Sequence, residues 1–163
     1  MRIRIVFTAD CAADAAWMAV HDPAVASELY APLMQMRPER ALPQRFGSGD
    51  EVRVTLRLLG VIPMGAQLIR IEDENPSHRL PDARTMRDAG RPLTGPLALL
   101  AGWNHEITVW PSQTGAVWHD ELTIRGWFAP LFFPVLAVMW RWRKSKLRRL
   151  ARTWEASAGL AAP

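Results

Sequence analysis

The sequence predicts a single α+β domain in which an antiparallel sheet of six or seven strands packs against one long C-terminal helix. Three observations predict this class. Strand-like alternation dominates the middle of the chain, a long segment with helical spacing follows it, and the strand–helix alternation of parallel α/β folds is absent. With 163 residues, 49% of them hydrophobic and 22% charged, the chain is large enough for one buried core.

The first 30 residues predict one strand and two short helices. Residues 2–7 predict a strand, because arginine and isoleucine alternate over residues 2–5 and residues 6 and 7 are apolar. Residues 12–20 are rich in alanine and predict a helix, and residues 24–29 predict a second one. Pro23 separates the two helices and Pro32 ends the second.

The middle of the chain predicts an antiparallel meander. The clearest strand covers residues 51–59, where Val52, Val54 and Leu56 share one face and arginines lie on the other. The last two strands form a hairpin around a turn at 112–115. The expected strands are 33–36, 51–59, 66–73, 84–88, 105–110 and 116–125, with loops at 37–50, 60–65, 74–83 and 90–96.

The C-terminal segment predicts a helix over residues 129–154. Pro130 suits its first turn, whereas Pro134 predicts either a later start or a kink. We therefore expect one domain over residues 1–156, with an Ala-rich tail at 157–163.

Charge and cysteine content restrict the function. Cys11 is the one cysteine, which excludes an internal disulfide and predicts a reducing, cytoplasmic setting; the apolar run at the N-terminus is too short for a signal peptide. The net charge of +4 comes from residues 141–163, which carry +6, whereas the remainder carries −2. This is a local basic patch, so we expect no nucleic-acid partner.

The order of these elements resembles that of the START-like helix-grip superfamily, in particular its SRPBCC branch of polyketide cyclase/dehydrase and lipid-transport proteins. The resemblance covers nearly the whole chain, and the order of the elements is more specific evidence for it than any single motif. It departs from the family at Ala116, where a threonine is usual, and in residues 90–102, which are longer and more apolar than expected. The motifs that carry it are Asp22-Pro23 with Leu29-Tyr30, Gly95-Pro96 before Trp103-Asn104-His105, Gly115 before Asp120-Glu121-Leu122, and Gly126 with Pro130.

The resemblance implies an apolar cavity between the sheet and the long helix, without a cofactor. The leading functional expectation is therefore the binding or transport of an apolar small molecule, lipid-like or polyketide-like. The expected wall consists of Val54, Leu56, Ile69, Ile71, His105, Ile107, Val109, Asp120, Leu122, Phe132, Leu136 and Met139, with Val52 and Ile124 beside them.

A pair of polar residues offers an enzymatic alternative. If Ile107 and Asp120 pair across the hairpin, His105 and Asp120 are diagonal neighbours on one face. An imidazole held by a carboxylate in an apolar site can act as a general base, as a cyclase or dehydratase requires. Passive hydrogen bonding of both groups is the simpler interpretation, so the sequence favours a binding protein. The widely spaced histidines predict no metal site.

A third hypothesis concerns a membrane surface. The apolar run 126–140 is too short for a spanning helix and contains two prolines, but aromatic residues followed by cations suit anionic lipid headgroups. Such a protein would dock on a membrane while its own side chains fill its core. The cations expected to make this peripheral contact are Arg141, Arg143, Lys144, Lys146, Arg148 and Arg149.

Overall fold

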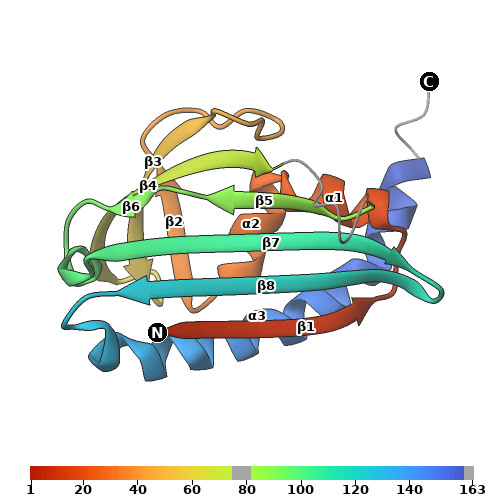
Figure 1. Ribbon diagram of the computed structural model, residues 1–163. Coiled ribbons are helices and arrows are strands. Elements are labelled where there is room, and N and C mark those ends of the chain that lie inside the picture. Colours follow the sequence, from red (N-terminus) through yellow and green to blue (C-terminus); the bar gives the residue numbers. More distant parts are fainter. Residues whose placement is uncertain (75–81, 160–163) are drawn as a thin grey trace.

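The computed structural model describes residues 1–74 and 82–159, and the side chains of the last helix as far as residue 154. An antiparallel sheet lies on one side of a long C-terminal helix, and two short helices follow the first strand (Figure 1). This confirms the predicted α+β architecture. The elements are β1 (Arg2–Ala9), α1 (Ala13–Val20), α2 (Pro23–Tyr30), β2 (Met34–Pro38), β3 (Glu51–Leu58), β4 (Ile62–Glu74), β5 (Arg84–Asp88), β6 (Arg91–Pro92), the 3₁₀ helix η1 (Pro96–Leu99), β7 (Gly102–Ser112), β8 (Gly115–Arg125) and α3 (Ala129–Gly159).

The sheet has eight strands in the described residues, one more than the upper limit predicted. Its order is β1-β8-β7-β5-β4-β3-β2, and the additional strand is the two-residue β6, which pairs with β4. Proline and glycine dominate the segment around β6, and that composition predicts a turn. The backbone of Arg91 nevertheless finds a strand partner in Leu68.

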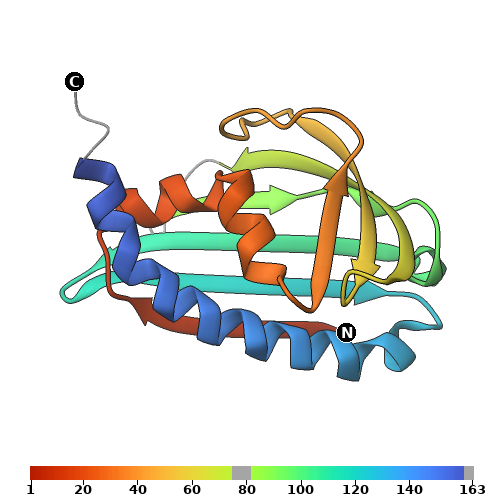
Figure 2. The same cartoon turned by 180° about the vertical axis from the view of Figure 1, so that it is seen from behind.

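The long helix α3 crosses the concave side of the sheet. Seen from behind, α3 runs diagonally past β1, β8 and β7, while α1 and α2 lie beside its C-terminal half (Figure 2). The strands β2, β3 and β4 stand apart from α3 at the other end of the sheet (Figure 2).

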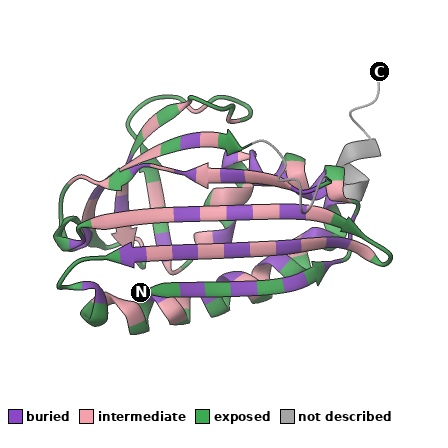
Figure 3. Cartoon of the chain, in the orientation of Figure 1, coloured by how far each residue is buried: buried purple, intermediate pink, exposed green. Residues whose placement is uncertain are grey.

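Alternation along the long strands explains which face is buried. In β8 every second residue from Ala116 to Ile124 is buried, and β1 shows the same period (Figure 3). Because side chains of a strand alternate between faces, one face of this edge of the sheet packs on α3 and the other meets solvent.

The long helix begins at Ala129, so the later start that Pro134 suggested is wrong. Pro134 lies inside α3 on its exposed side, one turn after Pro130, which is exposed as well. A proline leaves the carbonyl four residues earlier without its helical donor, and here that carbonyl belongs to an exposed residue that water can reach.

Two further boundaries differ from the prediction. The strand β4 begins at Ile62, within the predicted turn at 60–65, and α3 runs to Gly159, five residues past the helix end expected at 154. The predicted loop at 74–83 falls largely outside the described residues.

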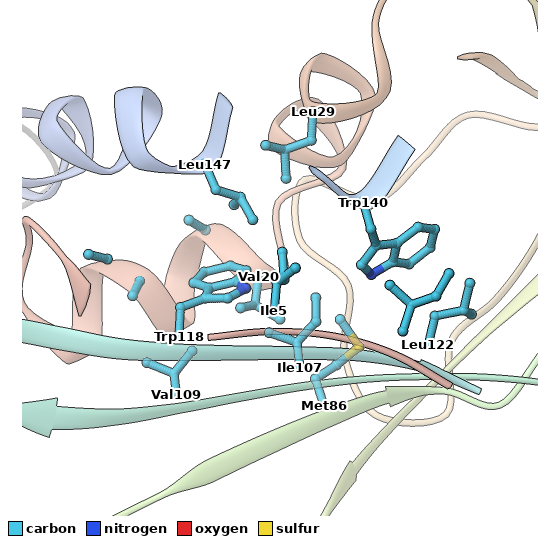
Figure 4. Close-up of a cluster of buried hydrophobic side chains, with 14 of the residues drawn as sticks. Ile5, Val20, Leu29, Met86, Ile107, Val109, Trp118, Leu122, Trp140 and Leu147 are labelled. Atoms are coloured by element: carbon cyan, nitrogen blue, oxygen red, sulfur yellow. The ribbon is translucent and has the colours of Figure 1, made fainter. Parts of the chain in front are cut away.

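The long helix packs closely on β1, and side chains of β8 extend the same buried layer. Trp118 and Leu147 project from the sheet and the helix into the same layer (Figure 4). The side chains of Val109, Leu122 and Leu147 have no exposed surface. This layer fixes α3 against the sheet.

Candidate ligand cavity

A cavity of about 390 Å³ lies between α3, α2 and the strands β2 to β5, with β7 and β8 contributing its floor. Its lining is mostly aliphatic, aromatic and methionine side chains, which is typical of small-molecule sites. The third hypothesis assumed an interior filled by its own side chains, and the cavity contradicts that assumption.

Most of the predicted wall borders this cavity. Val109, Asp120 and Leu122 do not, and neither do Val52 and Ile124. Val109, Leu122 and Ile124 lie in the packed layer instead and have no exposed surface. The predicted residues that border the cavity are Val54, Leu56, Ile69, Ile71, His105, Ile107, Phe132, Leu136 and Met139.

Asp120 is the centre of a buried hydrogen-bond network. Its side chain has no exposed surface. His105 Nε2 lies 2.9 Å from Asp120 Oδ1, and the indole Nε1 of Trp140 donates to the same oxygen at 2.8 Å. Arg143 Nε donates to Oδ2, also at 2.8 Å. Ile107 pairs with Asp120 as predicted, so the predicted contact of His105 with Asp120 is confirmed as a direct bond.

The charges in this network compensate each other. Burial opposes ionisation of Asp120, but the Arg143 guanidinium and the hydrogen-bonded His105 hold the pKa of that carboxyl well below its usual range. Burial would likewise lower the pKa of Arg143, and Asp120 raises it. Asp120 and Arg143 therefore form a buried ion pair of zero net charge.

Tyr30 extends the network to α2. The guanidinium of Arg143 lies 4.9 Å from the centre of the Tyr30 ring, in cation–π contact. Burial raises the pKa of Tyr30 to about 12, so its hydroxyl stays protonated at neutral pH. Four elements, β7, β8, α2 and α3, thus meet at one polar junction beside the cavity.

Asp88 is a second buried carboxylate, and it borders the cavity. It pairs directly with His105 across β5 and β7. Its Oδ1 accepts hydrogen bonds from the backbone N–H groups of Arg70 and Gly90 at 2.9 and 3.0 Å. Burial raises the pKa of Asp88, because no Lys or Arg pairs with it in the described part of the chain.

The cavity opens along one side of α3. Val135 and Val138 both border the cavity, yet their side chains are 64% and 63% exposed. Leu131 is exposed on the same helix, and Leu59 and Val61 are exposed in the β3–β4 turn. Leu58, next to that turn, also borders the cavity, so apolar side chains surround the mouth. None of the helices described is long and apolar enough to span a bilayer.

Arg143 corrects the predicted basic patch. It was expected on the surface with its neighbours, but its side chain is 3% exposed and bound to Asp120. Lys144 and Lys146 also turn inward, donating to the backbone carbonyls of Val6 and of Glu28 and Ala31. Arg141, Arg148 and Arg149 are the members of the predicted set that are classed as exposed.

Arg143, Asp88 and Gln67 are interior residues that were not predicted from the sequence. Arg143 had a detectable signal, because it lies three residues after Trp140 and four before Leu147 on the inward stripe of the helix. Asp88 lies two residues after the apolar Met86 in a predicted strand, which also places it on the inner face. Gln67 carried the same signal, because it lies two residues before Ile69 on the inner face of a predicted strand.

Comparison with known proteins gives the fold a clear precedent. No family model and no curated protein matches this chain. Among solved structures, protein CV1439 from Chromobacterium violaceum superposes with a TM-score of 0.67 at 15% identity, over 92% of this chain and 96% of that one. Protein MLL2253 from Mesorhizobium loti gives 0.66 at 12% identity, over 94% and 98%. DynU16, a protein in the dynemicin biosynthetic locus, gives 0.57 at 15% identity, over 93% of this chain and 47% of that one. These likenesses show the fold.

Proposed function

We propose that this chain is a START-like helix-grip protein that binds or transports an apolar small molecule, lipid-like or polyketide-like, in the cavity between the sheet and α3. The observation that carries the proposal is the cavity of about 390 Å³, lined almost wholly by apolar side chains. An empty space of this kind costs stability, because its lining loses packing contacts that a ligand would restore. The single buried Cys11 suits a reducing, cytoplasmic setting.

Filling the cavity tests this function directly. Val54 borders the cavity, whereas Val117 lies on the opposite face of the sheet in β8. We expect Val54→Phe to abolish or strongly weaken binding of an apolar fluorescent probe, and Val117→Phe to leave it unchanged. Mass spectrometry of organic extracts of the purified protein would identify any compound carried from the cell. A wild-type protein that carries nothing and ignores a panel of apolar probes would overturn the proposal.

A cyclase- or dehydratase-like activity is the second candidate, and the His105–Asp120 bond favours it. In the neutral tautomer that donates from Nε2 to Asp120, Nδ1 of His105 carries a lone pair. The ring borders the cavity, where such a nitrogen can accept a proton from a bound molecule.

The identity of the bound compound separates a carrier from an enzyme. An enzyme that loses its base keeps its unreacted substrate, so His105→Gln would retain a compound different from that found in the wild type. It would be heavier by one water where the reaction eliminates water, and of equal mass but different fragmentation and retention time where the reaction only closes a ring. The same compound in both proteins would leave only the carrier function.

The mouth of the cavity supports a peripheral contact with an anionic membrane. No acidic residue occurs in residues 126–154, which include the exposed Leu131, Val135 and Val138 and, three residues further on, Arg141. An apolar rim beside uncompensated cations suits a bilayer that contains anionic lipid.

Sedimentation with vesicles tests the membrane contact. We expect binding to phosphatidylglycerol vesicles that disappears at high salt and on changing Val135 and Val138 to aspartate. The control is Val6→Asp, because Val6 is an exposed valine in β1 that does not border the cavity. If the variant with aspartate at Val135 and Val138 binds the vesicles as well as Val6→Asp does, the proposed membrane contact is wrong.

A further inference from the structure

Three polar residues of the largely apolar wall carry donor or acceptor atoms that form no hydrogen bond of ordinary geometry. Gln67, Asp88 and His105 are each 7% exposed, and each borders the cavity. Within residues 1–74 and 82–154 the side-chain amide of Gln67 has no hydrogen-bond partner, and neither His105 Nδ1 nor Asp88 Oδ2 accepts a hydrogen bond of ordinary geometry. Buried polar groups normally have partners, so unused capacity at a cavity indicates the groups that meet a ligand.

The two acceptors lie side by side. Asp88 and His105 are direct partners in the register of β5 and β7, and their side chains share the cavity face. Directly opposite residues have Cβ atoms roughly 4.5–5.5 Å apart. A single polar atom of a ligand can therefore reach both.

The wall beside these acceptors also offers a donor. The indole N–H of Trp103 is buried without a hydrogen bond of ordinary geometry. Burial raises the pKa of Asp88, and Trp103 opposes this as a nearby side-chain donor, so the two side chains are neighbours. A group that both donates and accepts would satisfy Asp88 or His105 and Trp103 together.

The charges favour an uncharged head group. Arg143 is already neutralised by Asp120, so no free cation attracts a carboxylate, which would instead face Asp88. An ammonium group would pair with Asp88, but it would lose its water shell in an apolar wall that also contains the Arg143 guanidinium. A hydroxyl meets the acceptors and the donor without a charge to desolvate.

We infer that the cavity takes an apolar alcohol or phenol, whose hydroxyl donates a hydrogen bond to Asp88 beside His105. This inference rests on the proposed binding function and specifies the chemical class of its ligand. The apolar remainder of the ligand lies against the aliphatic and aromatic wall toward the mouth at Val135 and Val138.

Calorimetry with matched probes tests the head group. The probes are 1-dodecanol with dodecyl methyl ether and dodecanoate, and 1-naphthol with 1-methoxynaphthalene, so that two ligand shapes are covered. We expect the hydroxyl compound of at least one shape to bind about tenfold more tightly than its ether, and 1-dodecanol to bind more tightly than dodecanoate.

The variant Asp88→Asn provides the decisive control. It keeps Oδ1 as the acceptor for Arg70 and Gly90 but replaces the second oxygen by an N–H₂ donor, so the preference for the hydroxyl over the ether should fall below threefold. Asp10→Asn, at an exposed site, should keep the wild-type preference.

The outcomes separate the two proposals. Binding of hydroxyl and ether compounds with equal affinity, tighter binding of dodecanoate, or an unchanged preference in Asp88→Asn would overturn the head-group assignment and leave the binding function intact. Failure of every probe of both shapes to bind would overturn both.

Discussion

The two sides of the interior use similar apolar residues, yet one is packed and the other is hollow. Where β1, β8 and β7 face α3, Val109, Leu122 and Leu147 have no exposed surface. Where β2 to β5 face α2 and the first half of α3, Val54 and Ile71 are nearly as buried but border a cavity. Burial from solvent and contact between side chains are therefore different properties, and only the first follows from hydrophobicity.

The polar junction at Asp120 lies between the two sides, and its loss should have the largest effect on stability. We expect Asp120→Ala to lower the free energy of unfolding by about 3–5 kcal/mol, because Arg143 would stay buried without its partner. Urea unfolding followed by circular dichroism measures this. The neighbouring Glu121→Ala removes ion pairs with the exposed Arg2 and Arg4 and should cost less than about 1 kcal/mol. Equal costs would show that the junction has no special role.

Removing volume should distinguish the packed side from the hollow side. Leu147 has no exposed surface and does not border the cavity, so Leu147→Ala should cost about 2–5 kcal/mol. Met139 borders the cavity, where neighbouring space already exists, and Met139→Ala should cost at least about 1 kcal/mol less. Urea midpoints of the two variants make the comparison, and a larger loss for Met139→Ala would contradict it.

Adding volume should also cost more stability on the packed side than on the hollow side. Ala151 is fully buried away from the cavity, so Ala151→Leu should cost about 1–3 kcal/mol through overpacking. Val54→Phe extends into the cavity and should cost less than about 1 kcal/mol while it weakens probe binding. Thermal denaturation checks both values. A well-folded Val54→Phe protein with unchanged probe binding would place the ligand elsewhere.

The two buried aspartates should respond to pH in opposite directions, and this is the smallest effect. The pKa of Asp120 is depressed in the fold, so its contribution is present above the ordinary value of about 3.9 and is lost as the pH falls through the folded pKa. The pKa of Asp88 is raised, so its contribution is present below about 3.9 and is lost as the pH rises through the folded pKa. Asp88→Asn should therefore gain stability relative to the wild type as the pH rises from 4 to 7. Urea titrations across that range measure the difference, and a relative loss on the alkaline side would contradict the assignment.

The fold could be predicted largely from the sequence because local signals agree with it. Period-two alternation in residues 51–58 and 115–125 and helical spacing after Ala129 each appear within a short window. The pairing of Ile107 with Asp120 followed from the hairpin turn, which sets the register of both strands. The short β6 could not be predicted, since its pairing depends on the distant backbone of β4.

The candidate site was predictable only in part. His105 and Asp120 share one face of a local hairpin, so their contact was deducible. Arg143 reaches Asp120 from 23 residues away, and its basic neighbours made it look like a surface cation.

By itself the sequence determined the class of fold, the inner face of the long strands and the inward stripe of α3, because side-chain periodicity is set by local backbone geometry. The tertiary structure alone decided that the layers part beside β2 to β5 and enclose a cavity. The tertiary structure also decided that Asp88 and His105 lie at that cavity, each with an acceptor atom that forms no hydrogen bond of ordinary geometry. These properties depend on the distance between elements that are far apart in the chain, and no local pattern encodes that distance.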